Sequence, residues 1–306
     1  MIIVFGEPLL ELSWPAGGIA FGEAAQFGYS GDALNCAVYL ARLGQRVSCL
    51  TALGLDPFSE ALLAAMRREG IDCAQVLRAP DRLPGLYAIE TDADGERRFH
   101  YWRERSAARA FFAQPDAEAA LAWAAGASCL YLSGITLSLY SQERRDQITA
   151  LVKKVRTAGG HVAFDPNYRP SGWISPEQAR AAIEAIAPYV SIALPTASDE
   201  AQVFGEETPR AVAERWLGWG AAFVAVKLGA DGCLAASRTT QPTAIPAPQR
   251  LQPLDTTGAG DAFNAAFLTG LFEGQSPVEA AARANRLAGA VVQWSGAILP
   301  PEAMPA

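Results

Sequence analysis

Residues 254–267 read LDTTGAGDAFNAAF, a polar turn with two glycines that runs directly into an apolar stretch of helical spacing. The first N–H groups of a helix have no partner within the helix and lie at the positive end of its dipole. The small residues at 258–260 therefore predict a site that binds an anion. Asp261 stands beside that site, where it can take a proton from an attacking hydroxyl. The alternative is an ordinary helix start, in which Asp261 or Thr257 accepts hydrogen bonds from the free amides.

Short apolar runs alternate with alanine-rich amphipathic segments along most of the chain. Helices that end at glycine, together with strands that are apolar throughout, are typical of a parallel sheet covered on both faces. The pattern therefore predicts an α/β fold with a doubly wound, mainly parallel sheet. Strands are expected at 2–5, 47–53, 130–132, 162–164, 192–194 and 223–228, and helices near 32–43, 58–69 and 142–157.

One stretch interrupts this alternation. Residues 86–103 have no helical spacing and predict two extended arms joined by a turn at 92–95. A hairpin of this kind in an α/β protein predicts a small β lid over the carboxyl end of the sheet, with a simple edge hairpin as the alternative.

The second arm of the hairpin carries aromatic and basic side chains. Tyr101 and Arg103 lie on the same side of an extended strand, where a phenol and a guanidinium can bind a hydroxyl and a carboxylate together. A solvated strand with aromatic packing is the alternative. His100 faces the opposite side and His161 begins a buried strand, so neither histidine is expected to be catalytic.

Composition and charge exclude several classes of protein. The 306 residues are 50% hydrophobic, enough for a large core, and the net charge of −7 argues against nucleic acid as a partner. Neither a Walker A loop nor a Gly-x-Gly-x-x-Gly dinucleotide motif occurs. The five scattered cysteines favour neither a zinc site nor a disulfide framework. Without a basic leader or a long apolar run, the chain is expected to be cytoplasmic and not to contact a membrane.

The run DTTGAGD at 255–261 resembles the anion-hole signature Asp-Thr-x-Gly-Ala-Gly-Asp of the ribokinase-like (PfkB) carbohydrate kinases. The resemblance implies ATP and Mg²⁺ as cofactors, potassium near the anion hole, and a homo-oligomer formed through lid strands. It implies an α/β domain at 1–10, 28–84 and 107–306, and a β lid at 11–27 and 85–106. The catalytic residues that it implies are the base Asp261 and the phosphoryl-stabilising amides of Gly258, Ala259 and Gly260.

Further motifs resemble the 2-keto-3-deoxygluconate kinase branch of that family: YWRxxSAAR at 101–109, SGIT at 133–136 and FDPNYR at 164–169. This branch phosphorylates the 6-hydroxyl of a sugar acid, whereas the rivals are a fructokinase-like enzyme and a non-catalytic sugar-acid sensor. Arg169, which follows a predicted strand, can neutralise either the substrate carboxylate or the moving phosphoryl group. The resemblance implies contacts to the sugar acid from Gly31, Asn35, Tyr87, Tyr101, Arg103, Ile135, Arg169 and Asp261.

The run VKLGADGC at 226–233 is implied to be the nucleotide loop. The nucleotide contacts implied by the resemblance are Thr196, Lys227, Gly229, Gly232, Gly258, Gly260 and Asn285. Two departures from the family pattern stand out. Thr196 and Asp199 replace the usual Asn-x-x-Glu, so Asp199 is expected in the outer shell of Mg²⁺, with Glu200 as a substitute. In the second departure, Ser30-Gly31-Asp32 replaces a Gly-Gly motif.

Overall fold

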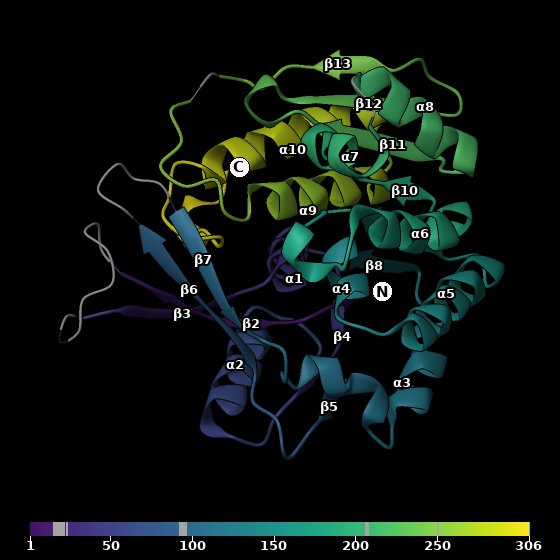
Figure 1. Ribbon diagram of the computed structural model, residues 1–306. Coiled ribbons are helices and arrows are strands. Elements are labelled where there is room, and N and C mark those ends of the chain that lie inside the picture. Colours follow the sequence, from purple (N-terminus) through teal and green to yellow (C-terminus); the bar gives the residue numbers. More distant parts are fainter. Residues whose placement is uncertain (15–21, 23, 92–96, 206–207, 250, 306) are drawn as a thin grey trace.

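The structure is a computed structural model (Figure 1), and it describes residues 1–14, 22, 24–91, 97–205, 208–249 and 251–305. The first predicted lid segment, 11–27, is described only in part, because residues 15–21 and 23 lie outside the described residues. The predicted turn at 92–95 also lies outside them.

A nine-stranded sheet forms the centre of the molecule, in the order β13-β12-β11-β10-β9-β8-β1-β4-β5. The strands from β11 to β5 are paired in parallel, whereas β12 and β13 are antiparallel. The predicted doubly wound, mainly parallel sheet is confirmed. The strands are β1 (Ile2–Phe5), β4 (Val47–Leu53), β5 (Val76–Arg78), β8 (Cys129–Ser133), β9 (His161–Asp165), β10 (Ile192–Ala193), β11 (Phe223–Lys227), β12 (Cys233–Ser237) and β13 (Thr243–Ile245).

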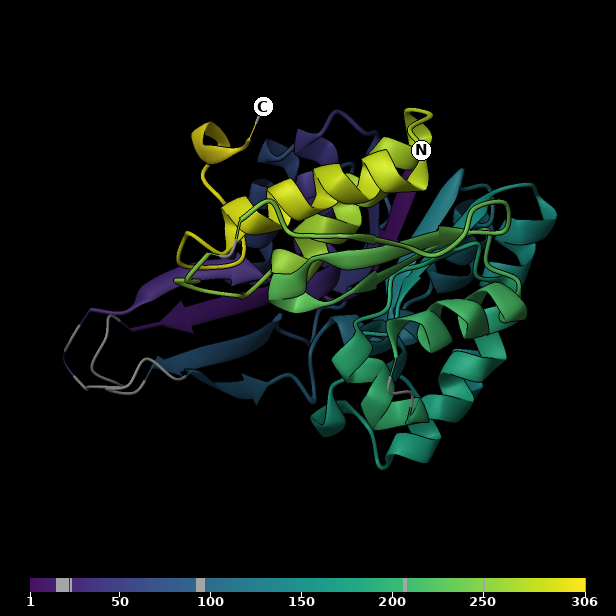
Figure 2. The ribbon, with the colours of Figure 1, turned by 90° about the horizontal axis from the view of Figure 1, so that it is seen from above.

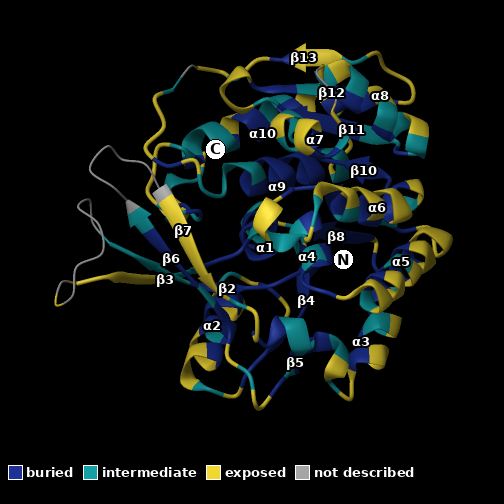
Figure 3. Cartoon of the chain, in the orientation of Figure 1, coloured by how far each residue is buried: buried dark blue, intermediate teal, exposed yellow. Residues whose placement is uncertain are grey.

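Helices cover both faces of this sheet because its strands send apolar side chains to both sides. In β1, Ile2 and Val4 join one hydrophobic cluster, whereas Ile3 and Phe5 join the other. Figure 3 shows these central strands as buried. The first cluster packs under α1 (Asp32–Arg42), α2 (Pro57–Arg68), α9 (Ala259–Phe272) and α10 (Pro277–Val291), and the second under α3 (Ala117–Ala124), α5 (Gln142–Thr157), α6 (Pro176–Ile186), α7 (Ala197–Phe204) and α8 (Pro209–Trp219).

Local sequence sets where the helices begin. Asp56 accepts hydrogen bonds from the amides of Phe58 and Ser59 at the start of α2, and Ser276 and Glu279 form a reciprocal capping box at the start of α10. No helix in the described parts of the chain is long and apolar enough to cross a membrane.

A second, four-stranded sheet projects from one side of the large sheet, as Figure 2 shows from above. Its order is β3 (Gln26–Ser30), β2 (Leu9–Ser13), β6 (Gly85–Thr91) and β7 (Arg97–Trp102), with β2 and β6 parallel and the other pairs antiparallel. The two strands β6 and β7 are the arms of the predicted hairpin. The sheet already begins at Leu9, two residues before the predicted lid segment.

The residues before the C-terminus are held on α1 by one buried phenol. The Tyr39 hydroxyl donates to the carbonyl of Ala297 at 2.8 Å and accepts from the amide of Leu299 at 3.0 Å. The Ala297 carbonyl in turn lies against Gly258, where an added Cβ would come within 2.5 Å of it. Tyr39 therefore links α1, the residues 297–299 and the turn before α9.

We expect Tyr39→Phe to lower the free energy of unfolding by about 1–3 kcal/mol, because two buried backbone groups lose their partner. Urea unfolding followed by circular dichroism measures this change. Tyr189→Phe is the matched control: it removes the same atom from a half-buried tyrosine and should change the free energy by no more than about 0.5 kcal/mol. Equal effects of the two substitutions would contradict the assigned role of Tyr39.

Candidate active site

Two cavities adjoin at the carboxyl ends of the central strands. The larger, about 670 Å³, lies between the large sheet and the small sheet, and the smaller, about 340 Å³, lies between α9, α10 and the β11–β12 turn. Because several residues line both cavities, a molecule bound in one can reach a molecule bound in the other. The shared residues are Arg169, Thr196, Lys227, Thr256 and Gly260.

The start of α9 lies at this junction, and no side chain of the described residues caps it. Gly258 is the cap residue in the left-handed conformation, with φ 76°. The preceding turn is fixed by Asp255, which accepts hydrogen bonds from the amides of Thr257 at 2.9 Å and Gly296 at 2.6 Å. The first amides of α9 are thus presented toward the cavities as an anion hole requires.

Asp261, in the first turn of α9, lies at the base of the larger cavity and is only 7% exposed. The Asn35 amide donates to its Oδ2 at 2.8 Å, so the carboxyl group does not act as a helix cap. Burial, aided by the nearby Asp32 carboxylate, raises the pKa of Asp261 to about 8, although Asn35 and Lys227 oppose the shift. Asp261 is therefore a carboxyl group with the proton affinity of a general base working near neutral pH.

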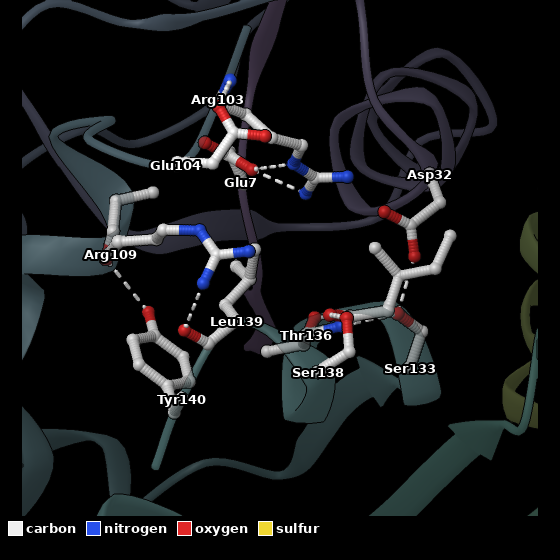
Figure 4. A network of polar contacts seen from close by, with 12 residues as sticks. Glu7, Asp32, Arg103, Glu104, Arg109, Ser133, Thr136, Ser138, Leu139 and Tyr140 are labelled. Carbon is white, nitrogen blue, oxygen red and sulfur yellow. Dashed lines mark hydrogen bonds and ion pairs between the residues drawn. The ribbon is translucent and has the colours of Figure 1, made fainter. Parts of the chain in front are cut away.

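Asp32 is a second buried carboxyl group in the same cavity. Burial is the main cause of its raised pKa, and hydrogen bonding from Ser133 and the charge of Arg103 oppose the shift. The Ser133 hydroxyl donates to its Oδ2 (Figure 4). In the sequence, Asp32 stood out only as a departure from a Gly-Gly motif, and its place in the cavity was not predicted.

Lys227 lies at the junction, and a buried polar network fixes it there. Its Nζ donates to Asp165 Oδ2 at 2.5 Å and to Asn264 Oδ1 at 3.1 Å. The Asn264 amide also donates to Asp165 Oδ2 at 2.6 Å and to the Tyr131 hydroxyl at 3.1 Å. The ammonium charge is thus balanced within the protein and held in one position. Neither Asn264 nor Tyr131 was predicted, because they come from elements far apart in the sequence.

The residues expected to bind the sugar acid all line the larger cavity. Across the β6–β7 pair, Tyr87 lies opposite Tyr101, with ring centroids 5.7 Å apart. The Arg103 guanidinium lies 5.8 Å from the centroid of the Tyr101 ring, so both side chains face the cavity as alternation predicts. His100 instead pairs with Glu90 on the other side. The lining residues among those predicted are Gly31, Asn35, Tyr87, Tyr101, Arg103, Ile135, Arg169 and Asp261.

Arg103 has a carboxylate partner that the sequence did not indicate. Its Nε donates to Glu7 Oε2 at 2.8 Å, its Nη2 bonds the same oxygen, and Glu7 is only 2% exposed (Figure 4). Glu7 lies two residues after the central strand β1, whereas Arg103 directly follows β7 of the small sheet. The ion pair therefore joins the two sheets at the edge of the cavity.

The residues expected to bind the nucleotide line the smaller cavity, apart from Gly258, which lines only the larger one among the described residues. The Asn285 amide donates to the carbonyl of Ile245 at 3.0 Å. The same carbonyl passes close to Gly232, where an added Cβ would come within 2.2 Å of it. Asn285 and Gly232 thus shape the cavity through the backbone around Ile245. The predicted residues that line it are Thr196, Lys227, Gly229, Gly232, Gly260 and Asn285.

Two acids, Asp199 and Glu200, were considered as neighbours of the Mg²⁺ ion, and they differ in their surroundings. Asp199 lines the smaller cavity and pairs with Arg169 at 3.2 Å, while burial raises its pKa against the influence of that arginine. Glu200 is 1% exposed and pairs with Arg215, so it does not replace Asp199 in the cavity. Within the described residues, no group of three or more His, Cys, Asp or Glu side chains could hold a metal ion.

The chain is similar to known carbohydrate kinases over nearly its whole length. The pattern of the pfkB family carbohydrate kinases matches residues 4–304. The 2-dehydro-3-deoxygluconokinase of Dickeya dadantii (strain 3937) is 39% identical over 311 residues, which cover 100% of this chain and 98% of that protein. A solved PfkB protein from Polaromonas sp. JS666 is 31% identical, with a TM-score of 0.84 and 95% of each chain covered.

A more distant structure shares the fold. An Escherichia coli protein provisionally named ribokinase II, solved in complex with ATP and Mg²⁺, is 21% identical, with a TM-score of 0.83 over 97% of this chain and 94% of that one. The family match and the full-length relatives lead to one conclusion: the chain belongs to the pfkB family of carbohydrate kinases.

Proposed function

We propose that this protein transfers the γ-phosphoryl group of ATP to the 6-hydroxyl of 2-keto-3-deoxygluconate. The observation that carries the proposal is the position of Asp261, buried beside the uncapped start of α9 at the base of the larger cavity. The Dickeya dadantii relative supports this choice of substrate over a fructokinase-like one.

The residues at the junction have separate tasks in this proposal. Asp261 accepts the proton of the attacking hydroxyl, and Asn35 fixes the orientation of its carboxylate through the 2.8 Å hydrogen bond. The amides of residues 258–260 stabilise charge on the transferring group, and Lys227 offers it an ammonium donor held in one position. When bound, Mg-ATP supplies the activated phosphoryl group.

The smaller cavity has the chemistry that a nucleotide needs. Its lining includes the apolar side chains of Leu251, Phe263 and Val292, which suit a base. It also includes Thr196, Lys227 and Gly260, which suit phosphates and their cation. The remaining expectations from the family resemblance belong to this proposal: Mg²⁺ near Asp199, potassium near the anion hole, a lid formed by the small sheet, a homo-oligomer and a cytoplasmic enzyme.

The proposal is tested by measuring ADP release from Mg-ATP with purified protein and a panel of acceptors: 2-keto-3-deoxygluconate, its galactonate epimer, gluconate and fructose. We expect turnover with the keto-deoxy acids and little with fructose. A preference for fructose would replace this substrate assignment, and the absence of turnover with every acceptor would favour the sugar-acid sensor.

Asp261→Asn should lower kcat by about 10²–10⁴-fold, because the variant cannot accept the proton. ATP binding should stay close to that of the wild type, since the smaller cavity is lined by other described residues. Steady-state kinetics and calorimetric titration of ATP separate the two effects. Turnover at the wild-type rate would show that another group is the base.

The raised pKa of Asp261 also predicts a pH-dependent stability. The carboxyl group ionises near its ordinary pKa of 3.8 when unfolded but only near 8 when folded, so the folded state holds the extra proton between these values. Raising the pH through this window should therefore destabilise the wild type relative to Asp261→Asn, by at most about 1.4 kcal/mol per pH unit. Urea unfolding from pH 4 to pH 9 measures the difference. Asp81→Asn, at an exposed carboxylate, is the control, and parallel profiles for Asp261→Asn and the wild type would contradict the prediction.

A further inference from the structure

The cations that line the larger cavity differ in whether their charge is balanced. Arg103 pairs with Glu7, Arg169 with Asp199 and Lys227 with Asp165. Arg109 also lines this cavity, and the described part of the chain gives it no carboxylate partner. Its charge is therefore available to a bound anion.

The Arg109 side chain is only partly satisfied by the protein. Its Nη1 donates to the carbonyl of Leu139 at 2.9 Å, while its Nε is buried and has no hydrogen-bond partner among the described residues. Figure 4 shows the guanidinium beside Leu139, with the Arg103–Glu7 pair above it in this view. Both arginines line the larger cavity.

The backbone that carries Arg109 is fixed, so the guanidinium is positioned before any ligand binds. The amide of Ala107 donates to Leu83 at 2.8 Å, and the carbonyl of Ala108 accepts from the Tyr140 hydroxyl at 2.9 Å. Phe111, two residues after Arg109, is fully buried in the core. A group held in this way loses little conformational freedom on binding.

The other charged groups of the cavity leave it without a net positive charge that could hold an acid substrate. Four carboxyl groups line it: Asp32, Glu104, Asp165 and Asp261. Asp165 is balanced by Lys227, and burial raises the pKa of Asp32 and of Asp261, so the charged forms of these two groups are disfavoured. An incoming carboxylate therefore loses its hydration without gaining a net positive partner from these groups. The Arg103–Glu7 pair offers hydrogen bonds, but its net charge is zero.

We infer that Arg109 binds the carboxylate of the substrate and provides the net positive charge that selects an acid over a neutral sugar. This inference rests on the proposed function. Arg103, held by Glu7, adds directed hydrogen bonds to the same carboxylate, and the Tyr101 ring packs against the Arg103 guanidinium. A guanidinium suits this role because its planar fork matches a carboxylate with two parallel hydrogen bonds.

The test compares two acceptors that differ only at C1: 2-keto-3-deoxygluconate and its neutral analogue 3-deoxyfructose, which has a hydroxymethyl group in place of the carboxylate. We expect Arg109→Gln to lower kcat/KM for the acid about 10- to 100-fold, mainly through KM. The value for the neutral analogue should change less than about threefold, and Arg109→Lys should retain part of the preference for the acid.

Arg105→Gln is the matched control, since it removes an exposed arginine four residues earlier in the same segment. It should change neither acceptor's kcat/KM, and thermal melting checks that all variants are folded. Equal losses for the acid and the neutral analogue in Arg109→Gln would mean a structural role and overturn the inference, as would an unchanged value for the acid. If the wild type itself fails to phosphorylate the acid, the proposed function fails. If the wild type phosphorylates the acid and its preference for the acid survives Arg109→Gln, only the inference about Arg109 fails.

Discussion

The close approach of Gly258 to Ala297 is the constraint on which the site depends. A Cβ on Gly258 would lie 2.5 Å from the Ala297 carbonyl, and its φ of 76° belongs to the region that favours glycine. Only a residue without a side chain lets the chain turn here and enter α9 with its first amides bare. Because Tyr39 holds residues 297–299 on α1, the turn before α9 is fixed by the packing of α1 and α9 and not by its own loop alone.

Buried charges around this turn are arranged so that each has a defined role. Lys227 is neutralised by Asp165 and locked by Asn264, which lets a positive charge stay at the junction without leaving an isolated ion in the core. Asp261 is buried, near the Asp32 carboxylate, and the hydrogen bond from Asn35 offsets only part of this effect, so its carboxyl group keeps a high proton affinity. The same low-dielectric surroundings thus hold the Lys227 ammonium beside Asp165 and disfavour the charged form of Asp261.

Local patterns in the sequence were sufficient for the fold and for the turn before α9. The apolar runs gave the central strands, including 2–5 and 47–53, because a parallel sheet buried on both faces requires uninterrupted apolar residues. Alternation placed Tyr101 and Arg103 on one side of β7. The pairing of Arg103 with Glu7 was not predictable, since the two residues are 96 positions apart and meet only when the sheets assemble. The helices α6 and α8 were not assigned, although Ser175-Pro176 and Thr208-Pro209 are typical helix starts.

The junction of the two sheets explains how one cavity can distinguish an acid from a neutral sugar. A salt bridge between Glu7 and Arg103 ties the small sheet to β1, which orients the guanidinium but cancels its charge. Discrimination by charge then requires a cation outside this pair, and Arg109 lies just after β7, on a backbone anchored to the core through Ala107 and Phe111. Orientation and net charge are therefore supplied by different arginines. A cavity that relied on one arginine for both would have to break the bridge between its sheets each time an acid is bound.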